Sequence, residues 1–253
     1  MRYLYLKITI VSMILLIFLP GRSQMYYGLK TGLNYATIRG SSYPEAKGMV
    51  GYNYSGIFDV NLQDIFTNLD KEKWSFQTEF NVSQKGAIVD FKRYNMKTAE
   101  EGDFIYQEDV KLFISYITIP MLMKYSLNGP NALSSPYFYM GPYLGGVALL
   151  TIDGHRFRDH NNFDEDEFRA YKDDFSGVDY GLVAGIGYYY KLGGPKSKWE
   201  LTGDLRYDYG MKKIGYKKVS KDLKGLIDDI KTNTVEFSIG IRMRIIRKDP
   251  FKK

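Results

Sequence analysis

The segment from Gly177 to Ile214 alternates between apolar and polar residues on both sides of a short break at Gly193, Gly194 and Pro195. From Trp199 to Tyr209, apolar or aromatic residues and one glycine occupy the odd positions, and mostly charged residues occupy the even positions. A period of two places these sets on opposite faces of a β-strand. Because glycine and proline are turn residues, the pattern predicts a long antiparallel hairpin.

The aromatic residues of this hairpin gather at both ends of its apolar face. Tyr188, Tyr190 and Trp199 lie beside the turn, and Tyr180, Tyr207 and Tyr209 lie at the open end. An apolar band with an aromatic belt at each margin is typical of strands that cross a membrane as part of a barrel. A soluble sheet would also bury one face, but it has no need to sort aromatic residues to both ends.

Six further segments alternate in the same way. They are 26–38, 48–62, 73–89, 110–127, 136–152 and 233–246. Each is at least as long as the 9–11 residues that a tilted membrane-spanning strand needs. Pro120 removes one backbone donor, which predicts a bulge or weak pairing in the fourth strand. With the hairpin, the sequence predicts an all-β protein, an eight-stranded antiparallel up-and-down transmembrane barrel.

The first 23 residues have the pattern of a secretory signal peptide. Arg2 and Lys7 precede an apolar run from Ile8 to Leu19, and small residues follow at Gly21 and Ser23. The alternative, a membrane anchor, is disfavoured because the run is short for a transmembrane helix. We therefore expect a signal peptide at 1–23 and one barrel domain at 24–253.

Cysteine content and charge exclude several classes of partner. The chain has no cysteine, so it has no disulfide, no thiolate metal site and no lipid attached through cysteine. Its net charge of +6 falls to about +3 once Arg2, Lys7 and Arg22 leave with the signal peptide. Without a concentrated basic tract or a nucleic-acid motif, we expect no nucleic acid partner, and no feature predicts a cofactor.

The connections between strands predict an orientation. Those after the second, fourth and sixth strands are shorter (63–72, 128–135 and 193–197), and those after the third, fifth and seventh are longer (90–109, 153–176 and 215–232). Outer-membrane barrels keep short turns on the periplasmic side and long loops outside. We therefore expect a chain surrounded by outer-membrane lipid, with both termini in the periplasm.

The inward positions carry charges of both signs in nearly equal number. An eight-stranded barrel is just wide enough for side chains to fill it, and buried charges must pair. The sequence therefore predicts a lumenal ion-pair network that closes the barrel, with bulk from Tyr137, Tyr139 and Tyr143; a narrow proton or ion path is the alternative. The candidate residues are Lys30, Asp59, Glu79, Lys124, Asp179, Glu200, Asp204, Arg206, Asp208, Glu236, Arg242 and Arg244.

Two of the longer loops have features of their own. Loop 153–176 contains His155 and His160 together with Asp153, Asp159 and the acidic run 164–167. Their spacing matches no metal motif, so a solvated acidic loop with a short helix near 164–173 is favoured over a metal site. In the last loop, apolar residues at helical spacing predict a short amphipathic helix within 217–230. That helix either packs on the barrel rim or serves as a docking surface.

Five stretches of the predicted strands share features with one another and with a known family: GLKTGLNYATIRG, YITIPMLMKY, FYMGPYLGGV, DYGLVAGIGYYYKL and LTGDLRYDYGMKKI. Together they resemble segments of the PorT-like outer-membrane β-barrel family of Bacteroidetes-type bacteria. The resemblance spans nearly all of 26–246 outside the loops, and the segment from Tyr116 to Lys124 is its most specific part. It implies an eight-stranded outer-membrane barrel without a shared catalytic site. One member of that family belongs to a protein-secretion apparatus, and most members have no assigned role.

These features favour a non-enzymatic barrel with a structural or protein-interaction role. Its partners would be other outer-membrane or secretion proteins that bind its outer loops. A narrow porin-like channel for small solutes or ions is the second hypothesis. An outer-membrane enzyme is the third, because the chain lacks cysteine and a Gly-x-Ser-x-Gly motif and has both histidines in one loop.

Overall fold

The computed structural model describes residues 24–39, 46–62, 73–94, 104–129, 131–152, 155–156, 178–213 and 231–246. The expected signal segment at 1–23, His160 and the helices expected at 164–173 and 217–230 lie outside these residues. Among the residues described, no helix is long and apolar enough to cross a membrane.

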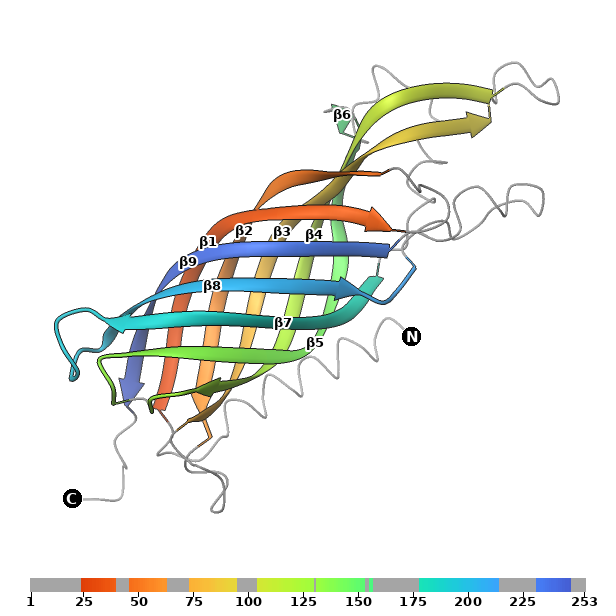
Figure 1. Cartoon of the computed structure of the whole chain (residues 1–253). Helices are drawn as coiled ribbons and strands as arrows, with labels where there is room; N and C mark the ends of the chain where they lie inside the picture. The colour runs from red at the N-terminus through yellow and green to blue at the C-terminus, as the bar shows by residue number, and fades with distance from the viewer. Residues whose placement is uncertain are drawn as a thin grey trace.

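The described residues form a closed antiparallel β-barrel of eight strands (Figure 1). The strands are β1 (Gln24–Arg39), β2 (Lys47–Asn61), β3 (Trp74–Tyr94), β4 (Phe104–Ser126), β5 (Ser134–Ile152), β7 (Val178–Lys191), β8 (Trp199–Gly210) and β9 (Lys231–Ile246). Each pairs with the strands before and after it, and the pairing of β1 with β9 closes the ring. The predicted up-and-down barrel is confirmed.

The loop predicted at 90–109 is wrong in its extent, because β3 and β4 continue into it. Their ladder runs from Phe91 opposite Gln107 to Tyr94 opposite Phe104, beyond the last pairs that β3 and β4 make with their other neighbours. The added residues include several aromatic side chains, which favour strands. In Figure 1 this hairpin projects past the end of the barrel.

A second difference concerns the loop predicted at 153–176. The two-residue strand β6 (His155–Arg156) pairs there with Thr151 and Ile152 of β5. It lies at the edge of the barrel wall and is not one of the eight strands that close the ring.

Side chains face inward and outward as the alternation predicts. On β8, for example, Leu201, Leu205 and Tyr207 are exposed on the outer wall, whereas Glu200 and Arg206 are buried inside. The end of β2 is an exception. Val60 and the following Leu62 have outward parity, but both side chains are buried.

The aromatic belts are present at the exposed margins. Tyr188, Tyr190 and Trp199 are about half exposed beside the β7–β8 turn. At the same end of the barrel, Trp74 of β3, Tyr125 of β4 and Phe138 of β5 form a row, with ring centroids 4.9 and 5.2 Å apart. This row continues the belt across strands, as expected for a wall at a membrane–water interface.

Pro120 interrupts the ladder without shifting it. The β3–β4 pairing stops at Thr78 opposite Met121 and resumes at Asn81 opposite Thr118 in the same register. The Thr78 hydroxyl donates a hydrogen bond of 3.0 Å to the Pro120 carbonyl across this gap. The predicted weak pairing is therefore found here, and the bulge is not.

Candidate functional site: the lumenal ion-pair network

The barrel interior contains all twelve residues singled out from the sequence. Each has at most 6% of its surface exposed. They come from β1, β2, β3, β4, β7, β8 and β9, because an inward position recurs at every second residue of each strand. The pairs that they form divide into a central cluster and one cluster toward each end of the barrel.

Arg206 is the centre of the network. Its guanidinium makes ion pairs of 2.9 Å with Glu79 and 2.7 Å with Glu236, and its Nε lies 3.3 Å from Asp208. Lys30 lies 2.7 Å from the other oxygen of Glu79 and 3.2 Å from Asp204. Because β3 does not neighbour β8 in the sheet, the Arg206–Glu79 pair crosses the lumen.

A second cluster lies toward the end of the barrel where β7 turns into β8. Arg242 of β9 contacts Asp59 of β2 at 2.8 Å and Glu200 of β8 at 2.7 Å. Lys124 of β4 pairs with the same Asp59 and donates a hydrogen bond of 3.1 Å to Gln77. Asp59 therefore joins two cations that come from opposite sides of the barrel.

Toward the other end, Lys85 and Asp179 add contacts to the network. Lys85 lies 3.1 Å from Asp208 and its ammonium sits over the rings of Tyr116 and Tyr143. Asp179 accepts hydrogen bonds from Tyr143 (3.1 Å) and from the Thr232 hydroxyl (3.4 Å). Aromatic faces favour nearby cations, so the tyrosines are part of this cluster's electrostatics.

Sequence reasoning missed two buried cations, Lys85 and Lys191. Lys191 donates a hydrogen bond of 3.0 Å to the Pro195 carbonyl in the β7–β8 turn. Both have the inward parity of their strands and lie within the predicted segments 73–89 and 177–214, so the alternation alone places them inside the barrel. Arg244, which was predicted, contacts the same turn through the Ser197 carbonyl at 3.5 Å.

The charges inside the barrel balance. Among the described residues, the buried cations are Lys30, Lys85, Lys124, Lys191, Arg206, Arg242 and Arg244, and the buried acids are Asp59, Glu79, Asp179, Glu200, Asp204, Asp208 and Glu236. Seven cations thus face seven acids. Buried charge is costly unless it is paired and hydrogen-bonded. Eleven of these fourteen residues form ion pairs with one another, and Asp179, Lys191 and Arg244 make hydrogen bonds to hydroxyl or carbonyl groups.

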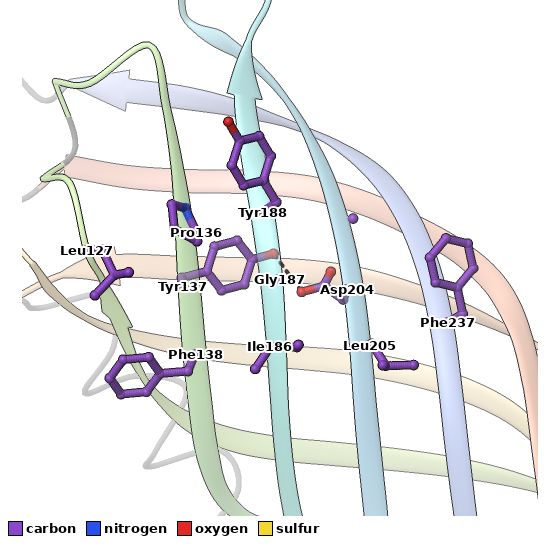
Figure 2. Close-up of a pocket in the computed structure, with 11 residues that line it drawn as sticks. Leu127, Pro136, Tyr137, Phe138, Ile186, Gly187, Tyr188, Asp204, Leu205 and Phe237 are labelled. Carbon is purple, nitrogen blue, oxygen red and sulfur yellow. Dashed lines mark hydrogen bonds between the residues drawn. The ribbon is translucent and has the colours of Figure 1, made fainter.

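Lumenal tyrosines of β5 fit against glycines of β7. Tyr137, Tyr139 and Tyr143 are paired in register with Gly187, Gly185 and Gly181. A Cβ added to any of these glycines would lie 2.5–2.7 Å from the facing tyrosine ring, so only glycine leaves room for the rings against the wall. Tyr137 also donates a hydrogen bond of 2.6 Å to Asp204, which Figure 2 shows behind Gly187.

Little free space remains near the turn-end cluster. A cavity of about 20 Å³ lies between Tyr26, Asp59, Lys124 and Arg242. That volume holds about one water molecule. Asp59 Oδ1 and Ser75 Oγ, which border this cavity, have no hydrogen-bond partner among the described residues, so a water there would satisfy them.

The described part of the chain contains no candidate metal site. Within the described ranges, no group of three or more His, Cys, Asp or Glu residues is arranged to hold a metal ion. His155 belongs to β6, whereas His160 and most of the acidic loop lie outside those ranges. The metal alternative for that loop stays untested.

A family model described as an outer membrane protein beta-barrel domain matches residues 21–215. Among solved structures, a major outer membrane protein from Thermus thermophilus is 13% identical (TM-score 0.47), with 88% of this chain and 99% of that chain covered. Neisserial surface protein A is 14% identical (TM-score 0.45; 87% and 97%), and OprG from Pseudomonas aeruginosa is 11% identical (0.43; 89% and 97%). A search of curated proteins finds no match.

Proposed function

Because this chain belongs to the family of outer membrane protein β-barrel domains, we propose that it is a non-enzymatic outer-membrane barrel with a closed lumen that presents its outer loops to protein partners. The observation that carries this proposal is the ion-pair network. Arg206 pairs with Glu79 across the lumen, and Lys30 contacts Glu79 and Asp204 from the same two opposite strands. Because Asp59 also joins Arg242 to Lys124 of the opposite strand, side chains occupy the space that a solute would need.

The narrow-channel alternative predicts a different interior. Aqueous pores of this kind have about 16–18 strands, and selective pores line their path with rings of one charge sign. Here an eight-stranded wall encloses tyrosines and balanced charges. This interior supports a structural lumen over a conducting one.

The lengths of the connections support an orientation. At one end of the barrel, the strands are joined by 62–73, 127–133 and 192–198; at the other end, the β3–β4 hairpin extends outward and the segments 153–177 and 211–230 join the strands. We propose that the shorter connections and both termini are periplasmic. The long connections would then be the surface that binds other proteins, in the manner of a PorT-like, secretion-associated barrel.

Conductance tests the closed lumen. We expect purified protein to give no steady single-channel current in a planar bilayer. A double variant, Tyr137→Ala with Tyr139→Ala, serves as the comparison, because it removes bulk from the lumen without removing a charge. A steady current from the unaltered protein would contradict the proposal.

Labelling tests the orientation, because the chain has no cysteine of its own. A membrane-impermeant maleimide applied to whole cells should label Lys213→Cys, at the end with the longer connections, and spare Ser197→Cys in the β7–β8 turn. Labelling of Ser197→Cys but not of Lys213→Cys would mean that the end with the shorter connections faces outward.

Partner recovery tests the interaction role. Deleting 158–172 should leave the barrel folded but remove proteins that co-purify after mild detergent extraction. If every co-purifying protein is still recovered with the deletion variant, residues 158–172 are not the binding surface. Lipid turnover by the purified protein would contradict the non-enzymatic part of the proposal.

A further inference from the structure

The outer wall of the barrel is indented over β5, β7, β8 and β9. Figure 2 shows Phe138 on β5, Ile186 and Tyr188 on β7, Leu205 on β8 and Phe237 on β9 around this groove. Its volume is about 590 Å³, and an adjoining hollow of about 490 Å³ shares Phe138, Ile186 and Leu205 with it. The three shared residues form a row across β5, β7 and β8, with one apolar hollow on each side of it.

Gly203 produces the indentation. It has the outward parity of β8 and is paired with Tyr188 on one side and Ile239 on the other. A Cβ added there would meet no heavy atom within 4 Å, so the space above the backbone is open. The neighbouring large side chains stand on either side of this gap and form its walls.

A basic turn stands at one end of the groove. Residues 192–198 join β7 to β8, with Gly193 and Gly194 at positive φ values of 91° and 102°. The Lys191 ammonium holds the Pro195 carbonyl at 3.0 Å, which ties the turn to the barrel. Lys196 and Lys198 are exposed on this turn.

The level of the turn relative to the membrane follows from the aromatic belt. Tyr188, Tyr190 and Trp199 lie directly beside the turn and are half exposed. Tyrosine and tryptophan in such belts sit at the headgroup level of a bilayer. The two lysines therefore lie at the depth of lipid phosphates, while the groove below Tyr188 lies at the depth of acyl chains.

We propose that this groove binds one anionic phospholipid, with an acyl chain over Gly203 and the phosphate at Lys196 and Lys198. The apolar lining suits the chain, and lysine ammonium groups bind phosphate as point charges. Basic residues near a membrane surface attract anionic lipid, so charge complementarity selects this occupant over a neutral lipid.

Tryptophan fluorescence tests the proposal in vesicles. The chain has only Trp74 and Trp199, so Trp74→Phe leaves Trp199, beside the basic turn, as the sole reporter. We expect brominated phosphatidylglycerol, present as a minor component in phosphatidylcholine vesicles, to quench Trp199 well beyond its mole fraction. Two lysines near the surface favour the anionic lipid roughly tenfold or more in relative binding constant. Brominated phosphatidylcholine should quench only in proportion to its mole fraction.

Three variants in the Trp74→Phe background separate the two halves of the site. Lys196→Gln with Lys198→Gln should abolish the preference for phosphatidylglycerol. Gly203→Leu should also abolish it by filling the groove. Gly56→Leu is the matched control, because a side chain added at Gly56 also meets open space but stands on β2, three strands away from β8, and it should keep the preference.

Equal quenching by the two lipids would overturn the proposal, as would a preference that survives both the lysine changes and Gly203→Leu. If Gly203→Leu does not fold, the lysine variant in the exposed turn carries the test alone. None of these outcomes depends on conductance or on protein partners, so the lipid site and the proposed function can fail separately.

Discussion

Arg206 shows how single residues hold the barrel closed. Its guanidinium reaches Glu79, Asp208 and Glu236, and all four side chains are buried. Removing one member of a buried ionic group leaves the remaining charges desolvated and unpaired, which is far more costly than losing an exposed pair. The stability of this region therefore depends on the whole group of residues.

Arg206→Met tests that dependence. We expect the free energy of unfolding in lipid vesicles to fall by about 3–5 kcal/mol, because Glu79 and Glu236 lose their shared partner. The matched control is Thr202→Val, on the same face of β8, whose hydroxyl has no hydrogen-bond partner among the described residues. Urea titration followed by tryptophan fluorescence measures both, and a comparable loss for the two variants would count against the network.

A second prediction concerns the glycines of β7. Gly185→Ala places a Cβ 2.6 Å from the Tyr139 ring and 2.8 Å from Arg206 Cβ, so we expect a loss of about 1–3 kcal/mol from overpacking. Gly56→Ala, where the added Cβ meets nothing within 4 Å, should be neutral or slightly stabilising. The same urea titration measures both variants. If Gly185→Ala leaves the free energy of unfolding unchanged, the tyrosine rings are free to move away from the added methyl group.

At the scale of elements, β8 carries both environments of the protein on one strand. Leu205 is half exposed in the apolar band, and Asp204 beside it is buried between Lys30 and Tyr137. Consecutive side chains of a strand point to opposite faces, so neighbours in sequence meet lipid and lumen.

This contrast predicts unequal effects on β8. Leu205→Arg should cost about 2–4 kcal/mol if it lies near the bilayer midplane, because a charge then faces hydrocarbon. Asp204→Asn should cost less, since Lys30 keeps Glu79 as its charged partner and an amide oxygen can still accept the hydrogen bond of Tyr137. Denaturant unfolding in vesicles measures both variants. Equal losses would mean that the assignment of the two faces is wrong.

At the scale of the whole molecule, closure of the ring is the dominant feature. Each of the eight strands pairs along its barrel portion on both sides, so the wall has no open edge in the described residues. A closed barrel has no edge strand, so no strand is available to separate from the sheet first.

Closure predicts heat modifiability on detergent gels. Unboiled protein should migrate as a compact species, and boiled protein should migrate at the position of its unfolded chain. Detergent alone should not open a ladder that is paired on both sides and joined across its lumen. Identical migration before and after boiling would be inconsistent with the closed barrel.

The sequence by itself determined the strand number, the closed all-β architecture and the face on which each side chain lies. These properties follow from local alternation, because a period of two assigns residues such as Arg206 and Leu205 to opposite faces whatever their distant partners are. It also located the turn at Gly193 and the weak pairing at Pro120, since both effects belong to single residues.

The tertiary structure alone decided which inward residues meet. Arg206 pairs with Glu79, and Tyr139 lies against Gly185, because of the stagger of the strands around the ring, which no local pattern encodes. The continuation of β3 and β4 past Val89 likewise depends on each strand finding the other as a partner. Alternation sets the direction of a side chain, but its contacts depend on residues far away in sequence.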